Sequence, residues 1–329
     1  MSVIDVHTHI VPEHFPAAPS PSCATRWPLM EHHPEHKASV MIGGKEFRLV
    51  DHRCWECARR LRDMDEGEIT MQVVSPMPEL LSYWLDLAAA EEMARHINGA
   101  IAGLIAAAPG RFAGLGMVPL QDPERAARAL GAIKSEYGLA GVEIGSNVNG
   151  KPPGHESFDP FWAEAERLGL AIFVHALHPT ATERMVGPAV LPTYLGFPVD
   201  TGLAAASLIT GRTLEKFPKL RVGFSHGGGI LAAILPRLAN GWRTAPPLKL
   251  AFQDPHATAR RFYYDNLVFE APFVRYLMSV FGASQIFVGS DYPFGAGQPH
   301  PTRFTREIGL DPGDWEAMSG GNARRFLSL

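Results

Sequence analysis

Cysteines and long apolar segments are scarce in this chain. Only three of the 329 residues are cysteines, and they are too few and too clustered to build a disulfide framework. We therefore expect a protein of the reducing cytoplasm. The most apolar stretch, from Ile97 to Gly110, is far shorter than the roughly 20 residues that a membrane-spanning helix needs. Asp5 interrupts the apolar start of the chain, so a signal peptide is not expected either.

An excess of positive charge is also missing. Thirty Lys and Arg residues stand against 34 Asp and Glu residues, for a net charge of -4, and no basic stripe stands out. The sequence therefore gives no support for a nucleic-acid partner. An apolar fraction of 46% excludes a disordered chain. The unusual count is 14 histidines, which directs attention to metal binding and acid–base chemistry.

Short β-branched segments alternate with longer helical patterns, which is typical of βα units around a parallel sheet. Helices are expected over Asp86–Ala108, from Asp122 onward, and over Phe158–Leu168 and Thr201–Phe217. The pattern predicts a (β/α)8 TIM barrel. A doubly wound open sheet is the alternative, but no glycine-rich fingerprint follows the first strand. The eight expected strands are Val3–His7, Ile69–Ser75, Phe112–Val118, Leu139–Gly145, Leu170–His175, Arg221–His226, Arg261–Asp265 and Gln285–Ser290.

Residues 12–57 interrupt the rhythm of strands and helices. Two short segments, Ala38–Ile42 and Lys45–Val50, flank the pair Gly43-Gly44 and predict a β-hairpin. We interpret 12–57 as an insertion that covers the mouth of the barrel, and residues 1–329 as a single domain. The histidines that precede the hairpin, at positions 32, 33 and 36, are expected to lie in a solvated loop.

Histidine or aspartate stands at the end of four expected strands. The carboxyl ends of barrel strands meet at one mouth, where barrel enzymes carry their catalytic groups. Residues two apart in a strand point the same way, so His7 and His9 can hold one ion between them. His175 and Asp291 would complete the set. Imidazoles with a carboxylate suit Zn²⁺ and related divalent metals.

His226 ends a further strand and has three possible roles: a metal ligand, a structural group or the acid–base catalyst. Four other residues already fill a mononuclear site, so a fifth imidazole is better used to transfer a proton. Binuclear enzymes of this architecture often bridge their metals with a carboxylated lysine on strand 4. The segment Leu139–Ser146 contains no lysine, although Glu143 is present. The sequence therefore predicts one divalent metal per chain.

These motifs together resemble those of the aminocarboxymuconate-semialdehyde decarboxylase family within the amidohydrolase superfamily. The resemblance extends from the first strand to the closing segment Gly321–Leu327, over nearly the whole chain. It is carried by His7-Thr8-His9, Phe47–Val50, Arg111–Gly116, His175, Glu215–Leu220, Ser225–Gly229 and Ser290–Phe294.

The resemblance implies a zinc-dependent, non-oxidative decarboxylase on an amidohydrolase-like barrel, usually a homodimer. Arg48, on the insertion hairpin, would hold a substrate carboxylate, and Arg237 would reach the pocket of the neighbouring subunit. Guanidinium groups suit this role because they bind carboxylates through two parallel hydrogen bonds. Phe294 would line the pocket. The implied metal ligands are His7, His9, His175 and Asp291, with His226 as the catalytic acid–base group.

The chain departs from the family pattern in the wall of the substrate pocket. After the strand-5 histidine the family has Pro-Trp-Asp, whereas this chain has Ala176-Leu177-His178. A second family tryptophan is replaced within Leu191–Tyr194. Neither change affects the expected metal ligands. His178 is either a pocket group or a loop residue.

We therefore expect release of CO₂ from a small unsaturated or aromatic carboxylic acid. The first candidate substrate is 2-amino-3-carboxymuconate-6-semialdehyde or a close analogue. The same site could instead serve a metal-dependent hydrolase or hydratase of a ring-cleavage acid or lactone. A degenerate barrel that only binds a ligand is the third possibility, and the complete set of metal-binding residues argues against it.

Overall fold

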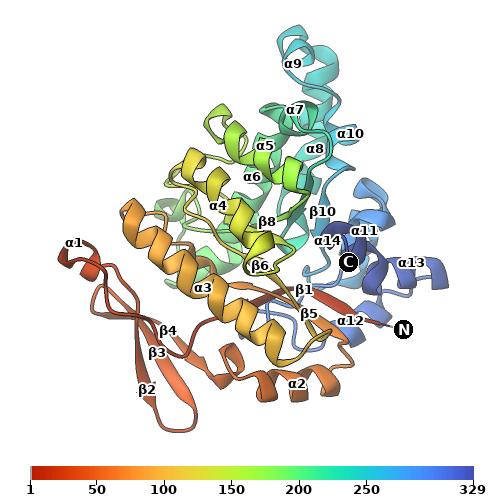
Figure 1. Cartoon of the computed structure of the whole chain (residues 1–329). Coiled ribbons are helices and arrows are strands. Elements are labelled where there is room, and N and C mark those ends of the chain that lie inside the picture. The colour runs from red at the N-terminus through yellow and green to blue at the C-terminus, as the bar shows by residue number, and fades with distance from the viewer. Residues whose placement is uncertain (1) are drawn as a thin grey trace.

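The computed structural model describes residues 2–329, and its main sheet has eight parallel strands paired in sequence order (Figure 1). This closed arrangement confirms the predicted (β/α)8 barrel, and the doubly wound alternative is wrong. All eight predicted strands are present, several of them shorter than expected. They are β1 (Ile4–Ile10), β5 (Met71–Pro76), β6 (Phe112–Gly116), β7 (Gly141–Gly145), β8 (Ala171–His175), β9 (Arg221–Phe224), β10 (Tyr263–Asp265) and β11 (Ile286–Phe287).

The barrel closes where β1 meets β11 and the loop that follows β11. Bridges join Asp5 to Val288 and Thr8 to Tyr292 in parallel. Backbone hydrogen bonds reinforce this seam: the amide of His9 donates to the carbonyl of Tyr292 at 2.7 Å, and the amide of Asp291 donates to the carbonyl of His7 at 2.8 Å. The first and last strands of the barrel are therefore held edge to edge.

A β-bulge in β1 turns two histidines toward the barrel interior. The register between β1 and β5 shifts between Asp5 and Thr8. Val6 packs in the interior apolar cluster with Phe173, yet the ring of the adjacent His7 also faces Phe173, at 5.3 Å between centroids. Two consecutive side chains can point inward only because the bulge interrupts the alternation of the strand. Below the site, the C-terminal helix α14 (Asn322–Leu327) packs Phe326 into the same cluster.

The helices surround the barrel, and aspartate side chains cap two of the longer ones, α3 and α4. The side chain of Asp86 caps α3 by accepting a hydrogen bond from the backbone amide of Ala89. The side chain of Asp122 caps α4 in the same way, by accepting from the backbone amide of Arg125. The predicted helix over 201–217 is instead two helices that meet at Gly211 and Arg212, where Arg212 has a left-handed backbone (φ 63°). The longer helices are α2 (Cys57–Glu66), α3 (Leu87–Ala107), α4 (Pro123–Ser135), α5 (Asp159–Leu168), α6 (Phe197–Thr210), α8 (Leu231–Thr244) and α11 (Ala271–Phe281).

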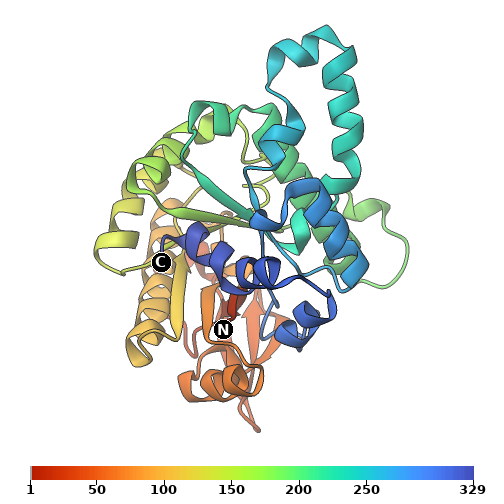
Figure 2. The same cartoon turned by 90° about the vertical axis from the view of Figure 1, so that its right-hand side faces the viewer.

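Shorter helices connect these elements. Figure 2 shows α8 and the following α9 as an arm that projects from the barrel body. Among residues 2–329, no helix is long and apolar enough to cross a membrane. The short helices are α1 (Pro21–Ala24), α7 (Thr213–Lys216), α9 (Pro246–Ala251), α10 (Pro255–Ala259), α12 (Pro301–Glu307), α13 (Pro312–Glu316) and α14.

The insertion forms a separate antiparallel sheet in the order β2-β3-β4. The predicted hairpin is confirmed as β3 (Lys37–Ile42) and β4 (Lys45–Asp51), and Gly43 and Gly44 turn it with positive φ angles of 63° and 70°. The expected solvated loop before the hairpin is wrong in part, because His32 and His33 belong to β2 (Leu29–His33), which pairs with β3. This sheet lies beside the barrel (Figure 1).

Candidate metal centre and active site

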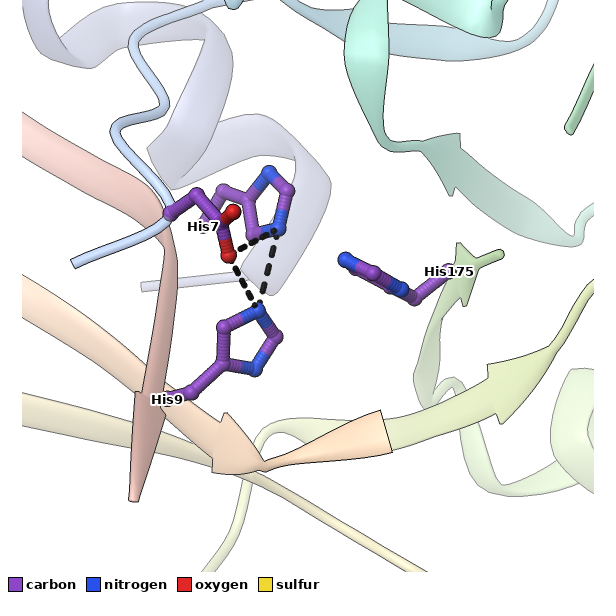
Figure 3. Close-up of side chains that lie close together, drawn as sticks. His7, His9 and His175 are labelled. Carbon is purple, nitrogen blue, oxygen red and sulfur yellow. Dashed lines mark hydrogen bonds and ion pairs between the residues drawn. The ribbon is translucent and has the colours of Figure 1, made fainter. Parts of the chain in front are cut away.

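The four predicted metal ligands converge at the mouth of the barrel. The Nε2 atoms of His7 and His9 are 3.1 Å apart. The Oδ1 atom of Asp291 lies 3.6 Å from the first and 3.1 Å from the second. His175 joins them from β8, and one ligand atom from each of the four residues lies within 4.8 Å of the others. Figure 3 shows the three imidazoles facing one another.

Each of the three imidazoles is held by its Nδ1 atom, which turns its Nε2 atom toward the others. Nδ1 of His7 lies 2.7 Å from the carboxylate of Asp265. Nδ1 of His9 lies 2.8 Å from the carbonyl oxygen of Pro76, and Nδ1 of His175 lies 2.8 Å from that of Ala176. Such partners fix the tautomer and the orientation of metal-binding histidines.

Two properties of this centre fit a divalent cation. Within residues 2–329, Nε2 of His175 is buried and has no hydrogen-bond partner, which is costly unless a ligand satisfies it. Burial alone lowers the pKa of His7, but the hydrogen bond and negative charge of Asp265, helped by Asp291, outweigh burial and raise the pKa to about 9. The centre therefore favours a positive charge, which a metal ion supplies as well as a proton does.

Asp265 is a site residue that the sequence analysis missed. Its buried carboxylate binds Nδ1 of His7 and also accepts hydrogen bonds from the backbone amides of His226 (3.0 Å) and Gly227 (2.7 Å). Those two residues have left-handed backbones, with φ angles of 54° and 63°. One side chain thus orients a candidate ligand and fixes the turn that carries His226. Its position at the end of β10 was the available signal, because polar residues at strand ends form the site.

His226 lies beside the four candidate ligands rather than among them. Its ring centroid is 5.1 Å from that of His175 and 5.4 Å from that of His7. Nδ1 of His226 is 3.1 Å from Oγ of Ser225. Burial, followed by the nearby positive charge of His7, lowers the pKa of His226 to about 4. The imidazole of His226 is therefore neutral near pH 7.

Glu143 occupies the strand where a bridging lysine would lie in a binuclear site. It is fully buried on β7, and Oγ of Ser75 donates to its carboxylate at 2.6 Å. The same hydroxyl lies 3.2 Å from Nδ1 of His9. Burial raises the pKa of Glu143 to about 7. The Ser75 hydroxyl therefore links Glu143 to the Nδ1 side of His9. Glu143 is not grouped with the four candidate ligands.

Arg48 and Phe294 line a cavity of about 350 Å³ that opens onto His175 and Asp291. The guanidinium of Arg48 lies 4.5 Å from the ring centroid of Phe294, and this ring stacks on His9 at 5.5 Å. No carboxylate of residues 2–329 pairs with Arg48. The structure thus brings two of the three predicted substrate-binding residues, Arg48 and Phe294, to the candidate metal centre. The guanidinium of Arg48 remains free to pair with an anionic ligand.

Arg237, the third of these residues, lies elsewhere. It is an exposed residue of the projecting helix α8 and is absent from the lining of this cavity. Across the described chain it also has no ion-pair partner. Within one chain, therefore, Arg237 is not part of the site.

The substitution Asp265→Asn tests the support of the metal centre. Asparagine has one acceptor oxygen in place of two, so it cannot serve His7 and both backbone amides as the carboxylate does. We expect metal affinity to fall by about 10- to 100-fold, measured by competition with a chelator. Asp311→Asn, which alters an exposed helix cap far from the site, is the control. Unchanged metal affinity in Asp265→Asn would contradict this role.

The comparisons with known proteins agree with the geometry. The amidohydrolase family pattern matches residues 4–329. The 2-amino-3-carboxymuconate-6-semialdehyde decarboxylase of Dictyostelium discoideum is 34% identical over 330 residues, covering 99% of this chain and 91% of that protein.

Solved structures with the same fold include 5-carboxyvanillate decarboxylase from Sphingomonas paucimobilis, with a TM-score of 0.82, 23% identity, and coverage of 100% of this chain and 99% of that one. A dihydroxybenzoic acid decarboxylase from Polaromonas sp. JS666, solved with bound manganese and the inhibitor 2-nitroresorcinol, has a TM-score of 0.79. It is 22% identical, and coverage is 100% of this chain and 97% of that one.

Proposed function

Because this chain belongs to the amidohydrolase family, we propose that it is a metal-dependent, non-oxidative decarboxylase. It releases CO₂ from a small unsaturated or aromatic carboxylic acid. The observation that carries the proposal is the cavity in which the unpaired guanidinium of Arg48 faces the same space as His175 and Asp291. The proposed substrate is 2-amino-3-carboxymuconate-6-semialdehyde or a close analogue, on which the Dictyostelium relative is named to act.

The proposed roles follow from the positions of the side chains. His7, His9, His175 and Asp291 would hold the cation, which when bound polarises an oxygen and lowers the pKa of water. Arg48 holds a carboxylate of the acid through its planar pair of N–H groups. Phe294 packs between Arg48 and His9 and excludes water from that side of the cavity.

His226 is the proposed acid–base group. Its Nδ1 atom faces Ser225, which leaves Nε2 as the atom that takes up a proton from solvent and later delivers it to the substrate carbon. Protonation of the conjugated system creates an electron sink, so the bond between carbon and carboxylate can break. The pair of electrons from that bond returns to the conjugated system, and CO₂ leaves.

Assay of CO₂ release tests this function. The metal-loaded protein is incubated with a panel of ring-cleavage acids and hydroxybenzoates, and released CO₂ is measured alongside substrate loss. We expect equal amounts of both for at least one acid. Loss of substrate without CO₂ would indicate the hydrolase or hydratase alternative and would contradict the decarboxylase.

We expect about one divalent cation per chain, and we propose zinc. Three imidazoles and one carboxylate form a single set of ligands, and this donor set suits zinc. Manganese is the competing ion because it is bound in the Polaromonas relative. Elemental analysis of the purified protein measures the amount and the identity. Two cations per chain, or none after supplementation with zinc and manganese, would contradict a mononuclear site.

The proposed assembly is a homodimer in which Arg237 enters the pocket of the partner chain. Two observations support it: the guanidinium is exposed without an ion-pair partner in the described chain, and the helix that carries it projects from the barrel (Figure 2). A second fixed cation would complete the binding of a dicarboxylate.

A further inference from the structure

Arg60 is a fully buried arginine on α2, the helix that follows the insertion. Among residues 2–329, no carboxylate forms an ion pair with its guanidinium. A buried charge without a direct counter-charge is costly unless hydrogen bonds satisfy it. The groups that Arg60 bonds therefore indicate what the buried charge is used for.

The guanidinium of Arg60 is held against β1 at the level of the candidate metal ligands. Nη1 donates to the carbonyl oxygen of His9 at 2.8 Å, and Nη2 donates to Oγ1 of the adjacent Thr8 at 3.1 Å. The remaining bonds go to Oε1 of Gln72 (3.1 Å) and to the carbonyl oxygen of Arg53 (3.2 Å). Arg60 thus fixes the backbone of the strand that carries His9.

The same guanidinium also contacts the segment that carries Asp291. It lies 4.8 Å from the ring centroid of Tyr292, the residue directly after Asp291. The hydroxyl of Tyr292 donates to the carboxylate of Asp63 at 2.8 Å, and Asp63 lies three positions after Arg60 on α2. One helix therefore holds both sides of the seam at which the barrel closes, next to a candidate ligand on each side.

We infer that Arg60 is a positioning residue of the candidate metal centre. It fixes His9 relative to Asp291 through the carbonyl of the first and the neighbouring ring of the second. Nε2 of His9 and Oδ1 of Asp291 lie 3.1 Å apart, and metal–ligand distances tolerate an error of only about 0.2 Å. A planar fork that bonds one segment and stacks on the other suits this task, which a lysine ammonium cannot fully perform. This role rests on the proposed function only in that a cation occupies the ligand set.

The substitution Arg60→Met tests the role, because methionine fills the space but donates no hydrogen bond. We expect the affinity for zinc to fall by about 10- to 100-fold, as for other residues that orient metal ligands, measured by competition with a chelator. The cobalt-loaded variant should also show shifted or weakened visible absorption bands, because these depend on the geometry around the ion. Arg60→Lys keeps the charge and should restore part of the affinity.

Arg221→Met is the matched control. Arg221 likewise donates to two backbone carbonyls, those of Phe326 and Gly169, without an acidic partner in the described chain. It is the first residue of β9, at the end of the barrel opposite the metal centre. Its replacement should lower thermal stability but leave zinc affinity and the cobalt spectrum unchanged. Circular dichroism confirms that each variant is folded before metal is added.

A second variant approaches the same contact from the other side. Tyr292→Leu removes the ring that faces Arg60 but leaves the hydrogen bonds of Arg60 to β1 in place. We expect zinc affinity and the cobalt spectrum to change in the same direction as in Arg60→Met, by a smaller amount. This variant also serves if Arg60→Met does not fold.

Two results would overturn the positioning role. One is a folded Arg60→Met or Tyr292→Leu protein with the zinc affinity and cobalt spectrum of the wild type. The other is an equal loss of affinity in Arg221→Met, which would assign the effect to general destabilisation. Neither readout depends on turnover. A wild type that binds one cation but releases CO₂ from no acid would therefore reject the proposed function and leave the role of Arg60 standing.

Discussion

Replacement of His226 by alanine is expected to abolish turnover while the metal stays bound. The imidazole lies beside the four candidate ligands, and its removal deletes the proposed acid–base group without opening the ligand set. General acid–base transfer contributes about 10²- to 10⁴-fold to a rate, so kcat should fall by a factor in this range. Steady-state CO₂ release and elemental analysis of the same preparation measure both properties.

His175→Ala is the matched comparison, because it removes a neighbouring imidazole that the structure does group with the other ligands. This variant should lose metal and turnover together. His226→Asn guards against a backbone effect, since asparagine tolerates the left-handed conformation at this position (φ 54°). If His226→Ala loses metal as His175→Ala does, then His226 is a ligand and its assigned role is wrong.

Two inactive arginine variants are expected to recover activity when they are mixed. Arg48→Ala and Arg237→Ala should each weaken substrate binding strongly, by about 2–5 kcal/mol, because each removes one partner of a desolvated ion pair. Neither variant should change metal content. The two proteins are dissociated, mixed and reassociated, and CO₂ release is followed over time.

The expected recovery follows from two-fold symmetry. In a mixed dimer, one site combines both substitutions, and the other combines the intact Arg48 of one chain with the intact Arg237 of its partner. That second site should be active. Arg243→Ala, at an exposed position near the end of the same helix, is the control and should be active before mixing. Mixed dimers that form and stay inactive would contradict a site shared between chains.

The strands and the candidate ligands were predictable because local sequence patterns specify them. Buried parallel strands need continuous apolar residues, as in Ala171–Val174, and polar residues that end such strands gather at one mouth. Strand β2 was missed for the opposite reason: four of its five residues are exposed. Its extended conformation depends on pairing with β3, which the local sequence does not indicate.

The sequence analysis also missed residues whose bonding partners lie far away along the chain. Asp265 supports His7 across 258 positions of sequence, and Glu79 pairs with His178 across 99. Neither carboxylate belongs to a motif that indicates its partner. The bulge in β1 is equally invisible in the sequence, although it allows Val6 and His7 both to face inward. Such features depend on tertiary packing.

The seam between β1 and β11 has a consequence for when the candidate metal site can form during synthesis. His7 and His9 lie on one side of this seam and Asp291 on the other, with His175 near the middle of the chain. A chain emerging from the ribosome offers the two histidines first, whereas Asp291 follows β11 and is therefore made only after all eleven strands. The four candidate ligands can therefore come together only after the last strand has been made, and a truncated chain that ends before Asp291 would offer only three of them.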